Sequence, residues 1–287
     1  MAVYTTFLPF RSGTAITLRL QCRYLGNLAQ VRIQGDPILM NERLKSEHRW
    51  IKLLLLGFWL VLLAVIFGTK VFSPDIYQYF IKEDSLSEYA QSIIYLLSSV
   101  FALSIAYRSL KSRLNLLGVL YGILALGLFF ISMEEISWGQ RIFGIANPEY
   151  FDKHNVQGEM TLHNLAYVQP LLRHIYIAIA FYGSFSWILT IALSPKAGFR
   201  WDNVLNFLTP PWYVAPYFFV CFCIYTFLHY VRPYVFYTEF GRTLSEEFWF
   251  FLHWRDEEHA ELFLSLGFLF FTILSYRKLY RCLQSSN

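Results

Sequence analysis

The sequence predicts an all-α integral membrane protein, a polytopic bundle of about six spanning helices with both termini on the inner side. Three observations carry this prediction: the composition, the apolar runs and the distribution of charge. Of the 287 residues, 56% are hydrophobic and only 15% are charged, with a mean hydropathy of +0.39. A soluble domain is about 25% charged, so one soluble core of this length cannot bury so many apolar side chains.

Six apolar runs follow one another, and each approaches the roughly 20 residues that a helix needs to cross the hydrocarbon core. In chain order they are Ile51–Thr69, Tyr89–Tyr107, Leu114–Ser132, Leu171–Leu193, Trp212–Val231 and Ala260–Tyr276. The uninterrupted apolar part of the last run is short, about 22 Å of helix against a core of about 30 Å. We therefore expect the sixth helix to begin earlier and to draw Glu261 and Glu258 into the outer part of the membrane.

The polar connections between the runs differ in charge. The inner ones, counted from residue 40 onward, hold 12 basic and 3 acidic residues, whereas the connections 70–88, 133–170 and 232–261 hold 7 basic and 16 acidic residues. Short loops rich in Lys and Arg stay on the cytoplasmic side. Every connection agrees with one orientation, in which both termini are inside and three acidic loops are outside.

Residues 1–39 do not follow this scheme, and we treat them as an N-terminal extension ahead of a transmembrane domain, 40–287. They contain four arginines and one acid but no long apolar run. Three interpretations remain: the true start is Met40, the segment targets an organelle, or it is an interfacial or disordered tail. We expect a bacterial cytoplasmic membrane, or an organelle membrane if the extension is a targeting segment.

The outer side collects the groups that can bind a metal or move a proton, including six of the seven histidines. The third run reaches the outer boundary at Glu134 and Glu135. Carboxylates at that depth are costly unless they are paired, protonated or bound to a cation. Glu134, Glu135 and Glu261 are therefore the candidate catalytic residues. The alternatives are an interfacial cap with Arg141 as counter-ion and a pair between Glu261 and Arg173.

Glu159 and His163 are the first candidate metal ligands. If the chain is helical from Glu159 onward, the two side chains are four residues apart and share one face of the helix. A carboxylate and an imidazole in that arrangement can ligate one ion, or act as a base and its orienting partner. The alternative is a weak pair on a surface helix.

His253, Asp256 and His259 are the second group of candidate metal ligands. On a helix, Asp256 and His259 are three residues apart, and Asp-x-x-His resembles half of a carboxylate-bridged di-metal site. The other half is missing from the sequence, because one residue too many separates Glu159 from His163.

Glu88 lies at the start of the second span and has two interpretations. Ser85 or Ser87 is expected to cap this helix, which places the Glu88 carboxylate favourably in the first turn. In the alternative, Glu88 faces the bundle beside Glu134.

Two segments carry a family resemblance: Met133–Arg141, which reads MEEISWGQR, and Asn155–Asn164, which reads NVQGEMTLHN. With Glu83, Asp84 and Glu88 ahead of a span, they resemble a family of uncharacterised bacterial polytopic membrane proteins. The resemblance covers residues 80–170. It implies the structural class and no particular activity.

Three functions fit these observations. The first is a membrane enzyme that acts on a lipid or lipid-linked substrate at the outer face, with a divalent metal ion as the candidate cofactor. The second is a scaffold or assembly factor that binds a membrane-protein partner. The third is a proton-coupled transporter using Glu134 and Glu261, although the inner halves of the third and sixth runs are almost wholly apolar. The lipid bilayer is the expected environment, and no nucleic-acid-binding motif is present.

Overall fold

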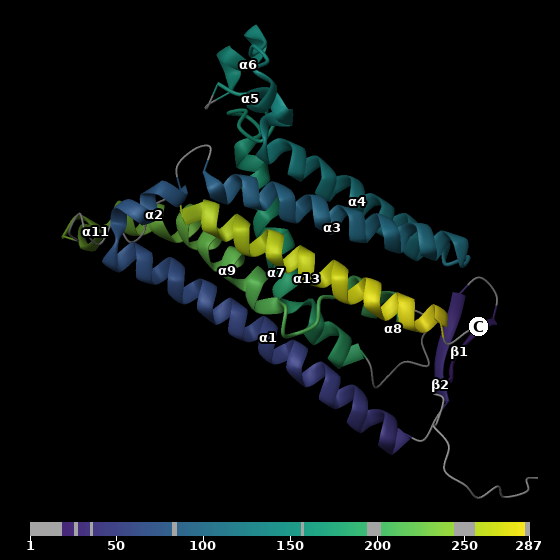
Figure 1. Ribbon diagram of the computed structural model, residues 1–287. Coiled ribbons are helices and arrows are strands. Elements are labelled where there is room, and N and C mark those ends of the chain that lie inside the picture. Colours follow the sequence, from purple (N-terminus) through teal and green to yellow (C-terminus); the bar gives the residue numbers. More distant parts are fainter. Residues whose placement is uncertain are drawn as a thin grey trace, which may run out of the picture.

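The computed structural model of the chain describes residues 19–25, 28–34, 37–81, 85–155, 158–193, 202–243 and 256–284. Within these ranges, six helices are long and apolar enough to cross a membrane, which confirms the all-α polytopic bundle. The described parts of the three acidic connections gather at one end of the bundle, called the outer end below (Figure 1). The end of the last helix lies at the opposite, inner end, as the charge pattern predicts.

A β-hairpin precedes the bundle. It consists of β1 (Arg19–Leu25) and β2 (Leu28–Gln34), which pair antiparallel with Arg19 opposite Gln34. This hairpin is not among the predicted elements. A signal for it exists, because apolar and polar residues alternate in both strands and Gly26-Asn27 separates the two runs.

The helices follow in the predicted order. Five of the membrane helices are α1 (Pro37–Phe72), α3 (Leu86–Lys111), α4 (Asn115–Glu135), α7 (Gln169–Leu193) and α13 (Glu257–Gln284). The other is α9 (Ala215–Thr226), continued by a π-helical turn (Phe227–Val231) and α10 (Arg232–Phe236). Short helices connect them: α2 (Pro74–Ile81), α5 (Gln140–Phe143), α6 (Glu149–His154), α8 (Asp202–Leu208) and α11 (Glu239–Thr243).

Two helix boundaries bear on the site. α13 begins at Glu257, so the sixth span starts earlier than its apolar run and includes Glu258 and Glu261, as predicted. The fifth span begins at Ala215 and not at Trp212. Pro216 explains this boundary, because proline fits the first turn of a helix but not its interior.

α13 lies in the middle of the bundle and has the largest buried share of the six spans. The pair α3 and α4 packs on one side of it, and α9, paired with α7, packs on another (Figure 1). Small residues allow the close approach of α3 and α4. Ser92 and Ser132 each donate a hydrogen bond of 2.8 Å to the other's carbonyl oxygen. Such bonds satisfy buried hydroxyls where no water is available.

α1 lies at the edge of the bundle, and none of the residues in its most apolar stretch is buried within the protein. Polar and charged groups help to attach it to its neighbours. The Lys52 ammonium lies 5.6 Å from the centre of the Tyr213 ring near the inner end. The Tyr217 hydroxyl donates a 2.6 Å hydrogen bond to the Leu55 carbonyl, and Lys70 forms an ion pair near the outer end.

Candidate functional site

A cavity of about 140 Å³ lies at the outer end, among α3, α4, the connection after α6, α7, α9 and α13. A water molecule needs roughly 10–15 Å³ measured in this way, so about ten waters or one small polar group fit inside. Seven glutamates from four segments line the cavity: Glu88, Glu134, Glu135, Glu159, Glu257, Glu258 and Glu261.

The rest of the lining is mostly polar and contains few positive groups. It consists of His163, Asn164, Gln169, Leu172, Arg173, Tyr176 and Tyr225. Seven carboxylates thus face one guanidinium and one imidazole. A concave site with one dominant sign of charge concentrates its field and attracts ions of the opposite sign. The cavity therefore favours a cationic group.

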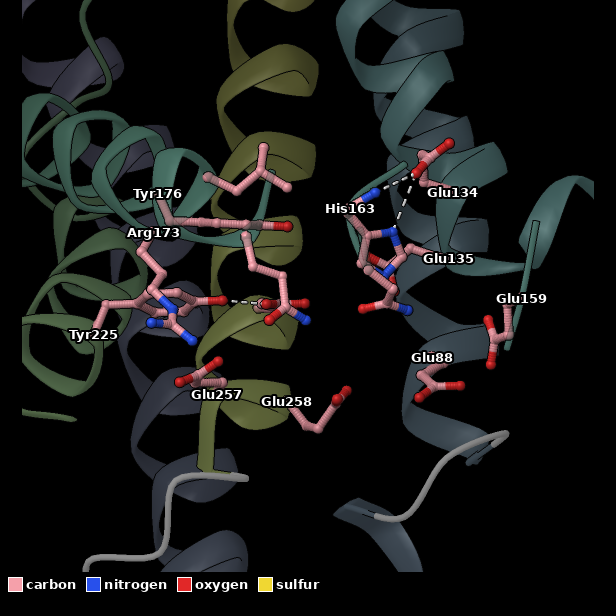
Figure 2. A pocket seen from close by; sticks show the side chains of 14 residues that line it. Glu88, Glu134, Glu135, Glu159, His163, Arg173, Tyr176, Tyr225, Glu257 and Glu258 are labelled. Carbon is pink, nitrogen blue, oxygen red and sulfur yellow. Dashed lines mark hydrogen bonds and ion pairs between the residues drawn. The ribbon is translucent and has the colours of Figure 1, made fainter. Parts of the chain in front are cut away.

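Glu134 joins the end of α4 to the connection that carries His163. Its Oε2 accepts hydrogen bonds from the backbone N–H groups of Leu162, at 2.7 Å, and His163, at 2.9 Å. The His163 Nδ1 lies 3.2 Å from the same oxygen (Figure 2), and the Trp138 indole donates to Oε1 at 2.6 Å. A buried carboxylate with four partners positions its neighbours, so this candidate catalytic residue has a structural task.

The two segments that carry the family resemblance form one structural unit. The Ser137 hydroxyl donates to Glu159 Oε2 at 2.6 Å, and the Met160 N–H donates to the side-chain carbonyl of Gln140 at 2.7 Å. Ser137, Trp138 and Gly139 all have positive φ values, of 48°, 55° and 77°. This left-handed turn directs the chain back toward the second segment. Strained backbone of this kind persists only where surrounding contacts hold it.

The predicted partnership of Glu159 and His163 is not formed. Residues 158–164 form bends and turns and no helix, so a spacing of four residues does not place the two side chains on one face. Ser137 binds the Glu159 carboxylate, and His163 contacts Glu134. Both residues still line the cavity, on the side where Figure 2 also shows Glu88.

Glu135 and Glu261 approach each other from α4 and α13, closely enough for their charges to interact. Glu135 has no hydrogen-bond donor within the part of the chain that the structure describes. Glu261 accepts a hydrogen bond from the Tyr225 hydroxyl, and the Tyr225 ring stacks on Tyr176 with centroids 4.9 Å apart. The alternative pair of Glu261 with Arg173 is not formed, although both residues line the cavity.

Glu88 satisfies both of its interpretations. Its backbone N–H donates to the Ser85 hydroxyl at 3.4 Å, which is the predicted cap of α3, while its carboxylate lines the cavity.

Glu257, at the start of α13, contacts a histidine. Its Oε1 lies 2.9 Å from His229 Nε2, in the π-helical turn that continues α9.

Asp256 and His259 lie outside the cavity lining and belong to a separate cluster. The Lys70 ammonium donates to Asp256 Oδ2 at 2.5 Å, and the Tyr77 hydroxyl donates to Oδ1. Burial and the Asp256 charge raise the pKa of Tyr77 above its usual value, so the phenol remains a donor. His259 is buried 5.0 Å from the Tyr77 ring, and neither of its nitrogens has a hydrogen-bond partner among the described residues.

The predicted metal centre is not assembled in the described ranges. No group of three or more His, Cys, Asp and Glu side chains in them is arranged to hold an ion. The reason is that Lys70 and Tyr77 engage Asp256 away from the cavity, while Glu159 and His163 bind separate partners. His253, the remaining candidate ligand, lies outside the described residues.

Two tyrosines of the site, Tyr176 and Tyr225, were missed by sequence reasoning, because aromatic residues in membrane helices usually form lipid-facing surfaces or interfacial belts. A signal for one of them exists. Gln169, Leu172, Arg173 and Tyr176 follow one another at helical spacing, so they share one face of α7.

Comparisons of the chain with protein families, with curated proteins and with solved structures give no match. The family resemblance of residues 80–170 therefore stays a prediction.

Proposed function

We propose that the chain is an integral membrane enzyme that transforms a lipid or lipid-linked substrate carrying a cationic group at the outer face of the membrane. One observation carries this proposal: seven glutamates from four segments face a single cavity at the outer end of the bundle. Intramembrane carboxylates are costly and mark functional sites by default. Their convergence favours chemistry in which carboxylates bind a cation and transfer protons.

Glu261 and Glu135 are the proposed acid–base pair. Carboxylates that share a confined site also share protons, so the set contains acceptors and donors together. The Tyr225 hydroxyl donates to Glu261, which suits the ionised form and the task of base. Glu135 lies among other carboxylates without a donor in the described part, which suits the task of acid.

In a hydrolysis, Glu261 takes a proton from water while the water oxygen bonds to the phosphorus or carbon of the scissile ester. Glu135 gives its proton to the leaving oxygen as the ester bond breaks. One water molecule is added across the bond, and both carboxyl groups exchange protons with solvent afterwards.

The packing below the cavity favours this function over a transport path. Between α3, α4 and α13, the core toward the inner end is filled by a cluster that includes Tyr95, Ile105, Tyr121, Leu128 and Phe271. Two serines of α3 in that region bond to backbone carbonyls, Ser98 to Ile94 and Ser99 to Ala125. A site open at one end suits a headgroup that enters from the membrane surface.

The test uses the full chain in vesicles made from a total bacterial lipid extract, with lipid products followed by mass spectrometry. Removing a positioned acid or base lowers rates about 10²- to 10⁴-fold. We therefore expect Glu135→Gln and Glu261→Gln to lose at least about a hundredfold in rate. Glu149→Gln is the matched control, because Glu149 is exposed on α6 and pairs only with Lys153 in the described part.

Two outcomes would contradict the proposal. One is that no lipid of the extract changes. The other is that both cavity variants act at the rate of the control. An activity that disappears with a chelator and returns with one equivalent of a divalent ion would instead replace the carboxylate mechanism with a metal-assisted one.

A further inference from the structure

We infer that the cavity takes a zwitterionic group, with its ammonium toward the glutamates and its phosphate at Arg173. The inference rests on the proposed function, because it names the class of substrate. Arg173 is the observation that leads to it. This guanidinium lines a cavity with seven carboxylates, yet it forms no ion pair or hydrogen bond within the described part of the chain.

The nearby carboxylates explain why Arg173 has no partner among the described residues. Glu261 accepts from Tyr225, Glu257 lies against His229, and Glu134 is satisfied by Trp138 and the backbone. Each of these acids thus has a partner other than Arg173. A half-buried guanidinium without a counter-ion is unfavourable unless a ligand supplies the anion.

The position of Arg173 separates the two charges across the cavity. Figure 2 shows Arg173 with Tyr176, Tyr225 and Glu257 on one side, and Glu135, Glu159 and Glu88 on the opposite side. Gln169 lies on the same face of α7, one turn before Arg173, and adds an amide group to the Arg173 side. A ligand that spans the cavity therefore meets the Arg173 guanidinium at one end and several carboxylates at the other.

Phosphate and ammonium are the groups that this arrangement fits best. The planar guanidinium presents parallel N–H donors that match two phosphate oxygens. An ammonium is compact and always a donor, so several carboxylates can surround it. The volume for about ten waters is that of a small headgroup and not of a whole lipid.

The experiment titrates the full chain, held in nanodiscs of phosphatidylglycerol, with phosphoethanolamine, ethanolamine and inorganic phosphate in separate calorimetric runs. We expect phosphoethanolamine to bind at least tenfold more tightly than ethanolamine, and phosphate alone to bind more weakly than either. In Arg173→Gln, this tenfold advantage should disappear while ethanolamine binding is kept. Arg277→Gln, an exposed arginine at the inner end, should retain the advantage.

Arg173→Lys covers the case in which the glutamine variant fails to fold. It keeps the charge but loses the paired donors, so we expect an advantage of about two- to fivefold, between those of the parent and the glutamine variant. A parallel titration in nanodiscs that contain phosphatidylethanolamine identifies the source. Weaker binding of the soluble probe there means that the lipid headgroup occupies the site, and equal binding means a free phosphoethanolamine-type ligand.

The possible failures are distinguishable. If ethanolamine binds and the phosphate adds nothing, the zwitterion is overturned and the cationic cavity of the proposed function stands. If phosphate alone binds as tightly as phosphoethanolamine, the cavity is an anion site and the inference is wrong. If none of the three probes binds, the inference and the proposed substrate class fail together.

Discussion

The outer end holds two kinds of carboxylate close together. They differ in how many hydrogen-bond donors they have among the described residues. Glu134 and Asp256 are satisfied: the first accepts from Trp138 and the backbone, and the second from Lys70 and Tyr77. Glu135, the next residue after Glu134, has no donor in the described part. Glu261, on the same helix end as Asp256, accepts from Tyr225, its one donor among the residues that the structure describes.

This difference in hydrogen-bond donors distinguishes carboxylates that stabilise the fold from carboxylates that serve activity. A buried acid with a full set of donors lowers the energy of one fold, so its loss should be visible in unfolding experiments. Acids that repel one another around a cavity stabilise nothing by themselves. They persist where activity needs them, and replacing them often leaves a protein as stable or more so.

The largest effect is expected from Asp256→Ala. The Lys70 side chain is only 6% exposed, and removal of Asp256 takes away the carboxylate that lies 2.5 Å from its buried ammonium. Breaking such a pair costs about 3–5 kcal/mol. We expect the melting temperature of the detergent-solubilised protein to fall by about 10 °C. Circular dichroism or intrinsic fluorescence on heating measures this.

The double variant Lys70→Met, Asp256→Leu controls for the ion pair. Replacing both charges by apolar groups is often neutral, because neither partner is then left unpaired. It should recover most of the lost stability. A double variant as unstable as the single one would show that the pair does not explain the effect.

The second effect concerns Glu134→Ala, which removes the acceptor that holds the Leu162–His163 backbone to α4. Charge-assisted hydrogen bonds contribute about 1.5–3 kcal/mol, so the connection should open more often. Trypsin cleavage after the exposed Lys153 reports this opening, and 2 kcal/mol corresponds to roughly 30-fold faster cleavage. Glu135→Gln is the adjacent control, and equal acceleration in both variants would remove the distinction between the two glutamates.

A third, smaller effect is expected from Tyr77→Phe. The lost hydrogen bond to Asp256 should lower the free energy of unfolding by about 1.5 kcal/mol near pH 7. Because the pKa of Tyr77 is raised in the fold, its contribution is fully present below pH 10, the ordinary tyrosine value. Above pH 10 the unfolded chain ionises first, so the difference between parent and variant should shrink. A difference that does not depend on pH up to 11 would contradict this account.

The smallest change in stability is expected from Glu135→Gln. Removing one charge from a crowded set of carboxylates relieves repulsion, so the melting temperature should stay within about 2 °C or rise. Only activity should fall, as in the test of the proposed function. A strongly destabilised Glu135→Gln would place this residue with Glu134 as a structural acid.

The positions of the spans and the side of the membrane on which each connection lies were predictable, because each depends on a property added up over many residues. Hydropathy over about 20 residues locates the spans, and the bias of basic residues sorts the connections by side. A local rule explains one shifted boundary, the start of α9 at Ala215, where Pro216 occupies the first turn. The clustering of acidic residues at one end of the bundle followed from the same charge counts of the connections.

The partners of individual side chains were not predictable in this way. Asp256 accepts a hydrogen bond from Lys70, which lies 186 positions away in the sequence. The spacing between Asp256 and His259 gives no indication of that contact. The interpretation of Glu159 and His163 assumed a helix, whereas the Glu134 carboxylate and the Ser137 turn hold that segment in bends. Contacts of this kind depend on tertiary packing, which periodicity does not encode.

The location of the cavity walls along the chain has a consequence for biosynthesis. One wall, which holds Glu88, Glu135 and Glu159, is complete by about the middle of the chain, whereas Glu261 belongs to the last helix. Domains are made from the N-terminus onward during translation. A nascent chain that lacks α13 therefore lacks Glu257, Glu258 and Glu261, and the ribosome must release the final helix before the cavity is complete.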